Sequence, residues 1–174
     1  MITAFEATIL GFLTNRQSSR YEIMKAFQTT SFYWSGSPGA VYSAIGRLEQ
    51  RELLRYVDSE HTKTYEITDL GKKKLQEFLK VPVPATKLLV DPTLLRIKLR
   101  GLEHLSTQDG ISFCEAQLIE LISAKDIVIE KRQLHPHSRI SLRLADLALA
   151  QLDLELELVK ELHSEFLDKG VGEP

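Results

Sequence analysis

The stretch that decides the fold is SPGAVYSAIGRLEQ, residues 37–50. It begins with Ser37-Pro38, a strong helix start, because serine can cap free backbone N–H groups and proline at the first helical position loses no hydrogen bond. The pattern therefore predicts a helix from Pro38 to about Arg51. At about 100° per residue, one arc of this helix is apolar and is expected to face the core. Its members are Val41, Ala44, Ile45 and Leu48.

The opposite face of this predicted helix is unusually bare. It carries small residues and then two longer polar side chains, in the order Gly39, Ser43, Gly46, Arg47 and Gln50. A glycine inside a helix costs roughly 1 kcal/mol relative to alanine, so a close approach to the backbone is a reason for Gly46. A small polar face with free amides at its start suits a DNA major groove. The alternative is that the two glycines pack against a neighbouring helix.

The segments on both sides predict the rest of a small domain. Helical spacing of apolar residues marks two helices before residue 37, the second capped by Ser18 or Ser19. After the third helix the apolar period changes to alternation, which predicts a two-stranded hairpin. The predicted helices cover 2–13, 19–29, 38–51 and 69–79, and the strands cover Leu54–Ser59 and Lys63–Thr68. The order helix, helix, helix, strand, strand is that of a winged helix.

Prolines end this region. Val81-Pro82-Val83-Pro84 and Asp91-Pro92 interrupt the helical pattern, since proline has no backbone donor and disfavours helix in the residue before it. The fold class we predict is mainly α with a small β-hairpin. Its expected parts are an N-terminal winged helix-turn-helix domain over 1–80, a linker over 81–91 and a C-terminal helical dimerisation domain over 92–170. Three helices are expected there, over 92–104, 107–134 and 138–169.

Composition fits an average soluble globular protein, with 43% hydrophobic and 26% charged residues among 174. Because no membrane-length apolar run or signal peptide is visible, we expect a cytoplasmic protein. Residues 1–80 contain 11 Lys and Arg against 9 Asp and Glu, and residues 81–174 contain 11 against 15. A nucleic-acid-binding protein with this balance must gather its basic residues on one surface.

Several motifs within about residues 4–80 resemble the PadR family of bacterial transcriptional regulators. They are Tyr21-Glu22-Ile23, Phe32-Tyr33-Trp34, Ser37 to Glu49, and Lys63 to Gly71. The spacing Gly-x-x-Tyr-x-x-x-x-Arg-Leu-Glu, followed by Tyr-x-x-Thr-x-x-Gly, is hard to reach by chance. The helical remainder resembles the C-terminal dimerisation region of the longer, virulence-activator-like branch. Arg20 and Glu52 stand where the family usually has glycine, and the second departure argues against a left-handed cap on the third helix.

The resemblance implies a DNA-binding surface. It implies that Tyr42 and the start of the third helix contact DNA. The helical wheel independently supports Ser43 and Arg47 as DNA contacts. The hairpin tip is expected to reach the adjacent backbone or minor groove, with Lys63 as the best phosphate contact. The predicted DNA-binding residues are Arg20, Tyr21, Ser37, Gly39, Tyr42, Ser43, Arg47, His61 and Lys63. The alternatives are a packing role for Tyr42, with its hydroxyl outward, and an ordinary solvated loop at the hairpin tip.

The last predicted helix carries apolar residues on more than one side, including Leu147 and Leu154. A small domain offers too little surface to cover them, and a second copy of the chain can do so. We therefore expect a two-fold dimer with its recognition helices one DNA turn (~34 Å) apart, or a multiple of it. The predicted dimerisation residues are Leu142, Leu149, Leu152, Leu156, Val159 and Phe166. The alternative is a monomeric bundle that covers the helix completely.

These patterns predict a sequence-specific DNA-binding transcriptional regulator, and we expect a homodimeric repressor because blocking a promoter needs only occupancy. The resemblance implies a small, often aromatic effector, with Trp34 either lining its pocket or serving as a core anchor. The alternative function is a winged-helix protein-protein interaction module. No catalytic or phosphate-loop motif is present, so the chain is not expected to be an enzyme. Neither His135-Pro136-His137 nor the single Cys114 suggests a metal site, and no cofactor is expected.

Overall fold

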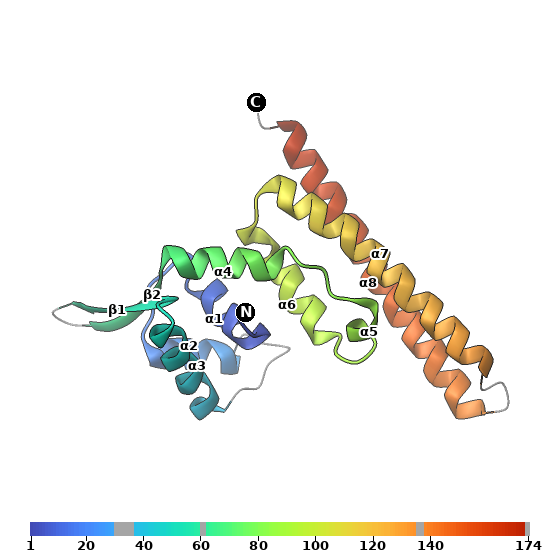
Figure 1. Cartoon of the computed structure of the whole chain (residues 1–174), viewed down its shortest axis with the longest axis horizontal. Coiled ribbons are helices and arrows are strands. Elements are labelled where there is room, and N and C mark those ends of the chain that lie inside the picture. The colour runs from blue at the N-terminus through green and yellow to red at the C-terminus, as the bar shows by residue number, and fades with distance from the viewer. Residues whose placement is uncertain (30–36, 60–61, 135–137, 173–174) are drawn as a thin grey trace. The chain divides into compact units, whose positions relative to one another are not determined.

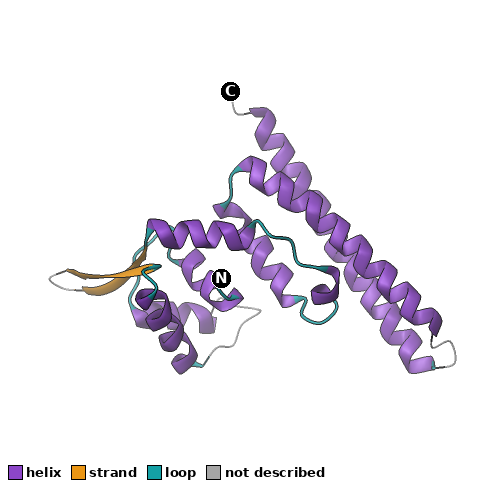
Figure 2. Cartoon of the chain, viewed as in Figure 1, coloured by secondary structure: helices purple, strands orange, loops and turns teal. Residues whose placement is uncertain are grey.

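The structure is a computed structural model, and it describes residues 1–29, 37–59, 62–134 and 138–172. The chain forms two compact units: Met1–Leu79 with Arg96–His104, and Lys80–Leu95 with Leu105–Pro174 (Figure 1). Among the described residues, all regular structure is helical except one antiparallel hairpin of two strands (Figure 2). The predicted fold class, mainly α with a small hairpin, is confirmed.

The first unit contains every helix and strand predicted for residues 1–80, with ends shifted by a few residues. Its elements are α1 (Ala4–Phe12), α2 (Arg20–Thr29), α3 (Pro38–Gln50), β1 (Leu54–Ser59), β2 (Thr62–Ile67), α4 (Asp69–Leu79), most of α6 (Thr93–Gly101) and the short turn η1 (Leu102–His104). Fully buried side chains of the three N-terminal helices form its centre: Ile9, Leu10, Ile23, Val41, Ala44, Ile45 and Leu48. Burial of these apolar surfaces is the main favourable term for this unit.

Side-chain caps explain where the helices begin. At α1, the Thr3 hydroxyl accepts a hydrogen bond from the Glu6 N–H at 3.2 Å, and the Glu6 carboxylate accepts one from the Thr3 N–H at 3.0 Å. Ser19 and Glu22 form the same reciprocal pair before α2. The Ser37 hydroxyl accepts from the Ala40 N–H at 3.3 Å, with Pro38 at the first helical position. These bonds satisfy N–H groups that have no partner inside their helices.

The hairpin is joined to the helices through its second strand. Its register pairs Leu54 with Ile67 and Tyr56 with Tyr65. Tyr65 also pairs with Ser18, just before α2, through N–H···O=C bonds of 2.8 and 3.1 Å in both directions. The hairpin is therefore attached to the helical part of the unit by backbone hydrogen bonds, beside the start of α2.

A close backbone approach explains the Thr-x-x-Gly part of the sequence motif. The Thr68 hydroxyl donates to the Glu52 carbonyl at 2.7 Å and accepts from the Gly71 N–H at 3.0 Å. The Thr68 N–H donates to the Leu53 carbonyl at 3.1 Å. A Cβ on Gly71 would lie 2.2 Å from that same carbonyl oxygen, so only glycine fits there. The motif therefore holds the end of α3 against the start of α4.

The end of α3 has a left-handed cap, although glycine is absent. Glu52 has a φ of 57°, and the Leu53 N–H donates to the Leu48 carbonyl at 2.9 Å. The expectation that glutamate at this position argues against such a cap was wrong. The bonds from Thr68 and Leu53 hold the backbone in this conformation at a steric cost that glycine would not incur.

The second unit consists mainly of two long antiparallel helices, α7 (Thr107–Leu134) and α8 (Arg139–Gly172), with the short helix α5 (Ala85–Leu88) packed on α7. Gln117 of α7 is fully buried, and its amide accepts from the Val83 N–H at 2.7 Å and donates to the Val83 carbonyl at 3.2 Å. Cys114 is also buried, which raises the pKa of its thiol to about 11. A thiol with this pKa is unreactive at neutral pH.

The two compact units do not coincide with the predicted division into 1–80, 81–91 and 92–170. Part of the predicted linker belongs to the second unit, because Val83, Ala85 and Leu88 are buried there. Residues 96–104 belong to the first unit, where the nearly enclosed Lys98 ammonium donates to the Phe78 carbonyl at the end of α4. A sequence pattern reports helices, whereas these contacts between distant segments decide the grouping.

Glu52→Gly is expected to raise the free energy of unfolding by about 0.5–1 kcal/mol, because glycine enters the left-handed region without a Cβ clash. Urea unfolding measures the change. Glu52→Ala is the matched control: it removes the exposed carboxylate but keeps the Cβ, so no gain in stability is expected. A Glu52→Gly variant less stable than the wild type would contradict this explanation of the cap.

Candidate nucleic-acid interface

The outer face of α3 is open, as the helical wheel predicts. Ser37, Gly39, Tyr42, Ser43 and Arg47 are all exposed. A Cβ built on Gly46 would meet nothing within 4 Å, so this glycine does not serve packing within the described residues. The side chains on the opposite arc are fully buried. The outer face of the helix is therefore formed mostly by small residues, and its long side chains are Tyr42, Arg47 and Gln50.

Two predicted phosphate contacts lie together beside this face. Arg20 of α2 and Lys63 of β2 line one surface hollow with Glu49, Tyr56 and Tyr65. The Arg20 guanidinium lies 3.6 Å from the Glu49 carboxylate and 5.2 Å from the centre of the Tyr65 ring. The ring and the carboxylate restrain this arginine, while half of its side chain stays exposed. The hollow thus gathers two positive charges from distant parts of the sequence.

Of the three remaining predicted site residues, one is exposed and two lie outside the described residues. Tyr21 is exposed on α2, with 61% of its surface accessible. His61, the predicted hairpin-tip contact, and Trp34, the predicted ligand residue, lie outside the described residues.

Glu6 lies buried behind this surface, and the sequence patterns did not identify it. Only 3% of its side chain is exposed, and its carboxylate accepts hydrogen bonds from Nε of Arg47 at 3.2 Å and from Nη1 of Arg51 at 3.3 Å. Burial tends to raise the pKa of Glu6. The Thr3 N–H bond and the two guanidiniums outweigh burial, and together they hold the pKa below its usual value. Glu6 is therefore an ionised group joining α1 to the far end of α3.

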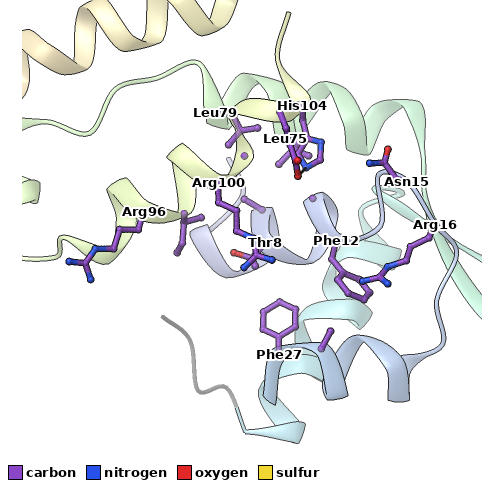
Figure 3. A pocket seen from close by; sticks show the side chains of 16 residues that line it. Thr8, Phe12, Asn15, Arg16, Phe27, Leu75, Leu79, Arg96, Arg100 and His104 are labelled. Carbon is purple, nitrogen blue, oxygen red and sulfur yellow. Dashed lines mark ion pairs between the residues drawn. The ribbon is translucent and has the colours of Figure 1, made fainter. Parts of the chain in front are cut away.

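A cavity of about 420 Å³ lies within the first unit, lined by α1, α2, α4, α6 and η1 (Figure 3). Figure 3 shows the guanidinium of Arg100 and the rings of Phe12 and Phe27 directed towards a common space. His104 also lines this space, and burial lowers the pKa of its imidazole, which is therefore neutral at pH 7. No sequence pattern predicts this cavity, because its lining comes from four separate segments. Its composition, apolar with a cationic side, suits a small anionic molecule with an apolar body.

Most of the predicted dimerisation residues are covered within the single chain. Leu152, Leu156 and Val159 are buried within this single chain, where α8 packs on α7. Phe166 also packs inside the unit, since its ring leaves no room for a Cβ on Gly110. Leu142 and Leu149 are half-buried. The seven-residue repeat thus identified mainly the face that joins the two helices of one chain.

A different apolar stripe of α8 is exposed. Its members are Ile140, Leu144, Leu147, Leu154 and Leu158, which fall within about 80° on a helical wheel and are 44–75% exposed. Ile119, Ile122 and Ile129 of α7 are exposed as well. Exposed apolar side chains repeated along one helix face make this stripe a candidate interaction surface.

The part of the chain that the structure describes contains neither a candidate metal site nor a membrane-spanning helix. It contains no group of three or more His, Cys, Asp or Glu side chains that could hold a metal ion. None of its helices is both long and apolar enough to cross a membrane.

Residues 9–77 match the model of the Transcriptional regulator PadR-like family. This match confirms the sequence-based prediction of the family, and it covers the part of the chain from α1 to α4. The family consists of transcriptional regulators rather than enzymes, so the prediction that this chain is not an enzyme is also confirmed. No curated protein matches the chain significantly.

Solved structures similar to this chain include three regulators. Bacillus subtilis PadR in complex with operator DNA shares 18% identity and a TM-score of 0.42, over 94% of this chain and 99% of that one. The PadR-like regulator BC1756 from Bacillus cereus shares 20% identity and a TM-score of 0.41, over 95% and 99%. The Vibrio cholerae virulence activator AphA shares 16% identity and a TM-score of 0.43, over 95% and 99%.

Proposed function

We propose that this chain, whose residues 9–77 form a PadR-like transcriptional regulator domain, is a sequence-specific DNA-binding repressor that acts as a homodimer and responds to a small effector. The observation that carries the proposal is the bare outer face of α3. Its core arc is fully buried, so the helix cannot turn this face inward. A protruding, small-residue helix of this kind fits the major groove, where base edges are distinguishable.

The flanking charges support the same surface. Arg20 and Lys63 lie together beside α3, and Arg47 lies on α3 itself. Their position beside α3 suits phosphate contacts by Arg20 and Lys63 with a DNA backbone at the edge of the inserted helix. The proposed contacts are Arg20, Tyr21, Ser37, Gly39, Tyr42, Ser43, Arg47, His61 and Lys63. Repression follows from occupancy, since a dimer bound over a promoter excludes polymerase without further contacts.

The DNA-binding proposal is tested by selecting duplexes from a random pool and measuring their affinity for the chain between 50 and 200 mM salt. The wild type is expected to select a sequence and to bind it more weakly as salt rises. Arg47→Ala is expected to lower the affinity about tenfold or more, while Lys73→Ala, which removes an exposed charge of α4, changes it little. If no sequence is enriched, the chain is instead a protein-interaction module.

The proposed dimer uses the exposed stripe of α8. A second copy would cover Leu147 and Leu154, which are 65% and 68% exposed at the middle of this stripe. Homodimers commonly bury an apolar helix face of this kind, and a two-fold axis matches the repeated half-sites of an operator. The second unit therefore serves as the dimerisation domain in this proposal.

Leu147→Glu and Leu154→Glu are expected to give a monomer, because each places a charge in the middle of the dimer interface. Analytical ultracentrifugation should show the wild type at about twice the chain mass of 19.8 kDa and the variants near that mass. Leu167→Glu is the control, since Leu167 is exposed but lies on another side of α8. A wild type that sediments as a monomer would refute the dimer.

The effector is proposed to bind in the cavity of the first unit. Arg100 lies on the cavity wall and has no ion-pair or hydrogen-bond partner among the described residues, so it is available to an anionic group. Phe12, Phe27 and Leu75 provide apolar surface for the body of the molecule. The helices α1 and α2 pack against α3 and also line this cavity. A ligand that prefers one packing of these helices therefore shifts the position of α3 and with it the affinity for DNA.

Naphthalene-1-sulfonate is a suitable probe, because it combines one negative charge with an apolar body. Calorimetry should show saturable binding to the wild type, and Arg100→Ala should weaken it roughly tenfold through loss of a charged hydrogen bond. Lys73→Ala is again the matched loss of one positive charge and should bind the probe normally. Equal binding by wild type and Arg100→Ala would rule out Arg100 as the anion-binding group of this cavity.

A further inference from the structure

A buried carboxylate, Glu6, lies behind the proposed DNA-binding surface and contacts two arginines. Glu6 lies in the first turn of α1 with 3% of its side chain exposed. Its Oε1 accepts a hydrogen bond from Nε of Arg47 at 3.2 Å. Its Oε2 accepts from Nη1 of Arg51 at 3.3 Å and from the Thr3 N–H at 3.0 Å. Both oxygens are engaged, so the carboxylate has a fixed position.

The two arginines on this carboxylate are held in different ways. Arg51 directs both terminal nitrogens to the protein: Nη1 bonds to Glu6, and Nη2 donates to the Met1 carbonyl at 3.3 Å. Arg47 contributes only its Nε, and 52% of its side chain remains exposed. Among the described residues, no other group is hydrogen-bonded to the Arg47 guanidinium. Arg51 is thus a structural arginine, whereas Arg47 has a free outer edge.

This geometry suits recognition of a base. A guanidinium is a rigid plane with five N–H donors, so fixing Nε fixes the direction of Nη1 and Nη2. Those two groups match the O6 and N7 acceptors of guanine in the major groove. A side chain already held in place also loses less conformational entropy when it binds. One carboxylate between two guanidiniums leaves a net positive charge, so the attraction of Arg47 for DNA is not cancelled.

We propose that Glu6 is a positioning residue for base recognition: it holds the guanidinium of Arg47 so that its terminal nitrogens read a guanine. This role rests on the proposed DNA-binding function. Glu6 itself does not touch DNA, because it is enclosed between α1 and α3. The class of target follows from the chemistry of the free edge, which offers two parallel donors and no acceptor.

Glu6 also caps α1 and links it to α3, so a loss of stability alone would not identify the positioning role. The test therefore measures discrimination at a single base. The probe is the duplex that the wild type selects from a random pool, with each guanine replaced in turn by 7-deazaguanine, which lacks the N7 acceptor.

At one guanine the wild type is expected to lose affinity roughly five- to tenfold on this replacement, and Arg47→Ala is expected to be insensitive to it. Glu6→Ala should lose most of this discrimination, to about twofold or less. In the double variant Glu6→Ala/Arg47→Ala, the losses of discrimination should not add, because both substitutions remove the same interaction. Thermal unfolding reports whether each variant is folded.

Glu49→Ala is the matched control, since Glu49 pairs with Arg20 on the same surface. If Glu6 acted only through its charge, both alanine variants would bind any DNA more tightly and keep their discrimination. Arg51→Ala leaves the hydrogen bond between Arg47 Nε and Glu6 in place, so this variant should also keep its discrimination at the guanine. Should Glu6→Ala fail to fold, Glu6→Gln replaces it, because an amide has one acceptor oxygen and cannot serve both arginines; an intermediate loss is then expected.

A folded Glu6 variant that discriminates at that guanine as well as the wild type would overturn the positioning role and leave the proposed function standing. Wild-type protein that selects no sequence would overturn the proposed function, and this inference with it. Loss of discrimination in the Glu6 and Arg47 variants, with normal behaviour of Glu49→Ala, supports the inference.

Discussion

Burial of the inner arc of α3 is the constraint on which the rest of the first unit depends. Val41, Ile45 and Leu48 have no exposed surface, and each such side chain contributes about 1.5–3 kcal/mol by leaving water. Turning the helix by one residue would bury Tyr42 or Arg47 and expose this arc. The rotation of α3 is therefore fixed energetically, and with it the direction of the small polar face that the domain presents to solvent.

The end of α3 is fixed as firmly as its rotation. The backbone turns at Glu52, and the carbonyls of Glu52 and Leu53 receive hydrogen bonds from Thr68. Gly71 lets α4 approach the same backbone. At the other side, Glu6 joins α1 to Arg47 and Arg51. A helix restrained at its core face, its end and its long side chains is a rigid element, as precise recognition requires.

The second unit shows how one apolar helix can serve two purposes. One arc of α8 is buried against α7, and a separate stripe that includes Leu147 and Leu154 is exposed. Both arcs repeat with helical spacing, so the sequence indicates a helix with more than one apolar side but cannot say which side meets its own chain. The predicted dimerisation residues followed the stronger seven-residue repeat, and three of them, Leu152, Leu156 and Val159, are buried within the single chain.

The sequence by itself determined the elements of this protein: local signals such as the Ser37-Pro38 helix start and the alternation over the hairpin act between near neighbours. It also determined the outer face of α3, since a helical wheel needs only the sequence of that helix. Only the tertiary structure decided what joins distant segments: Glu6 on Arg47, Arg20 beside Lys63, the cavity around Arg100 and the grouping of residues 96–104. Such contacts depend on how whole elements pack, which no local spacing encodes.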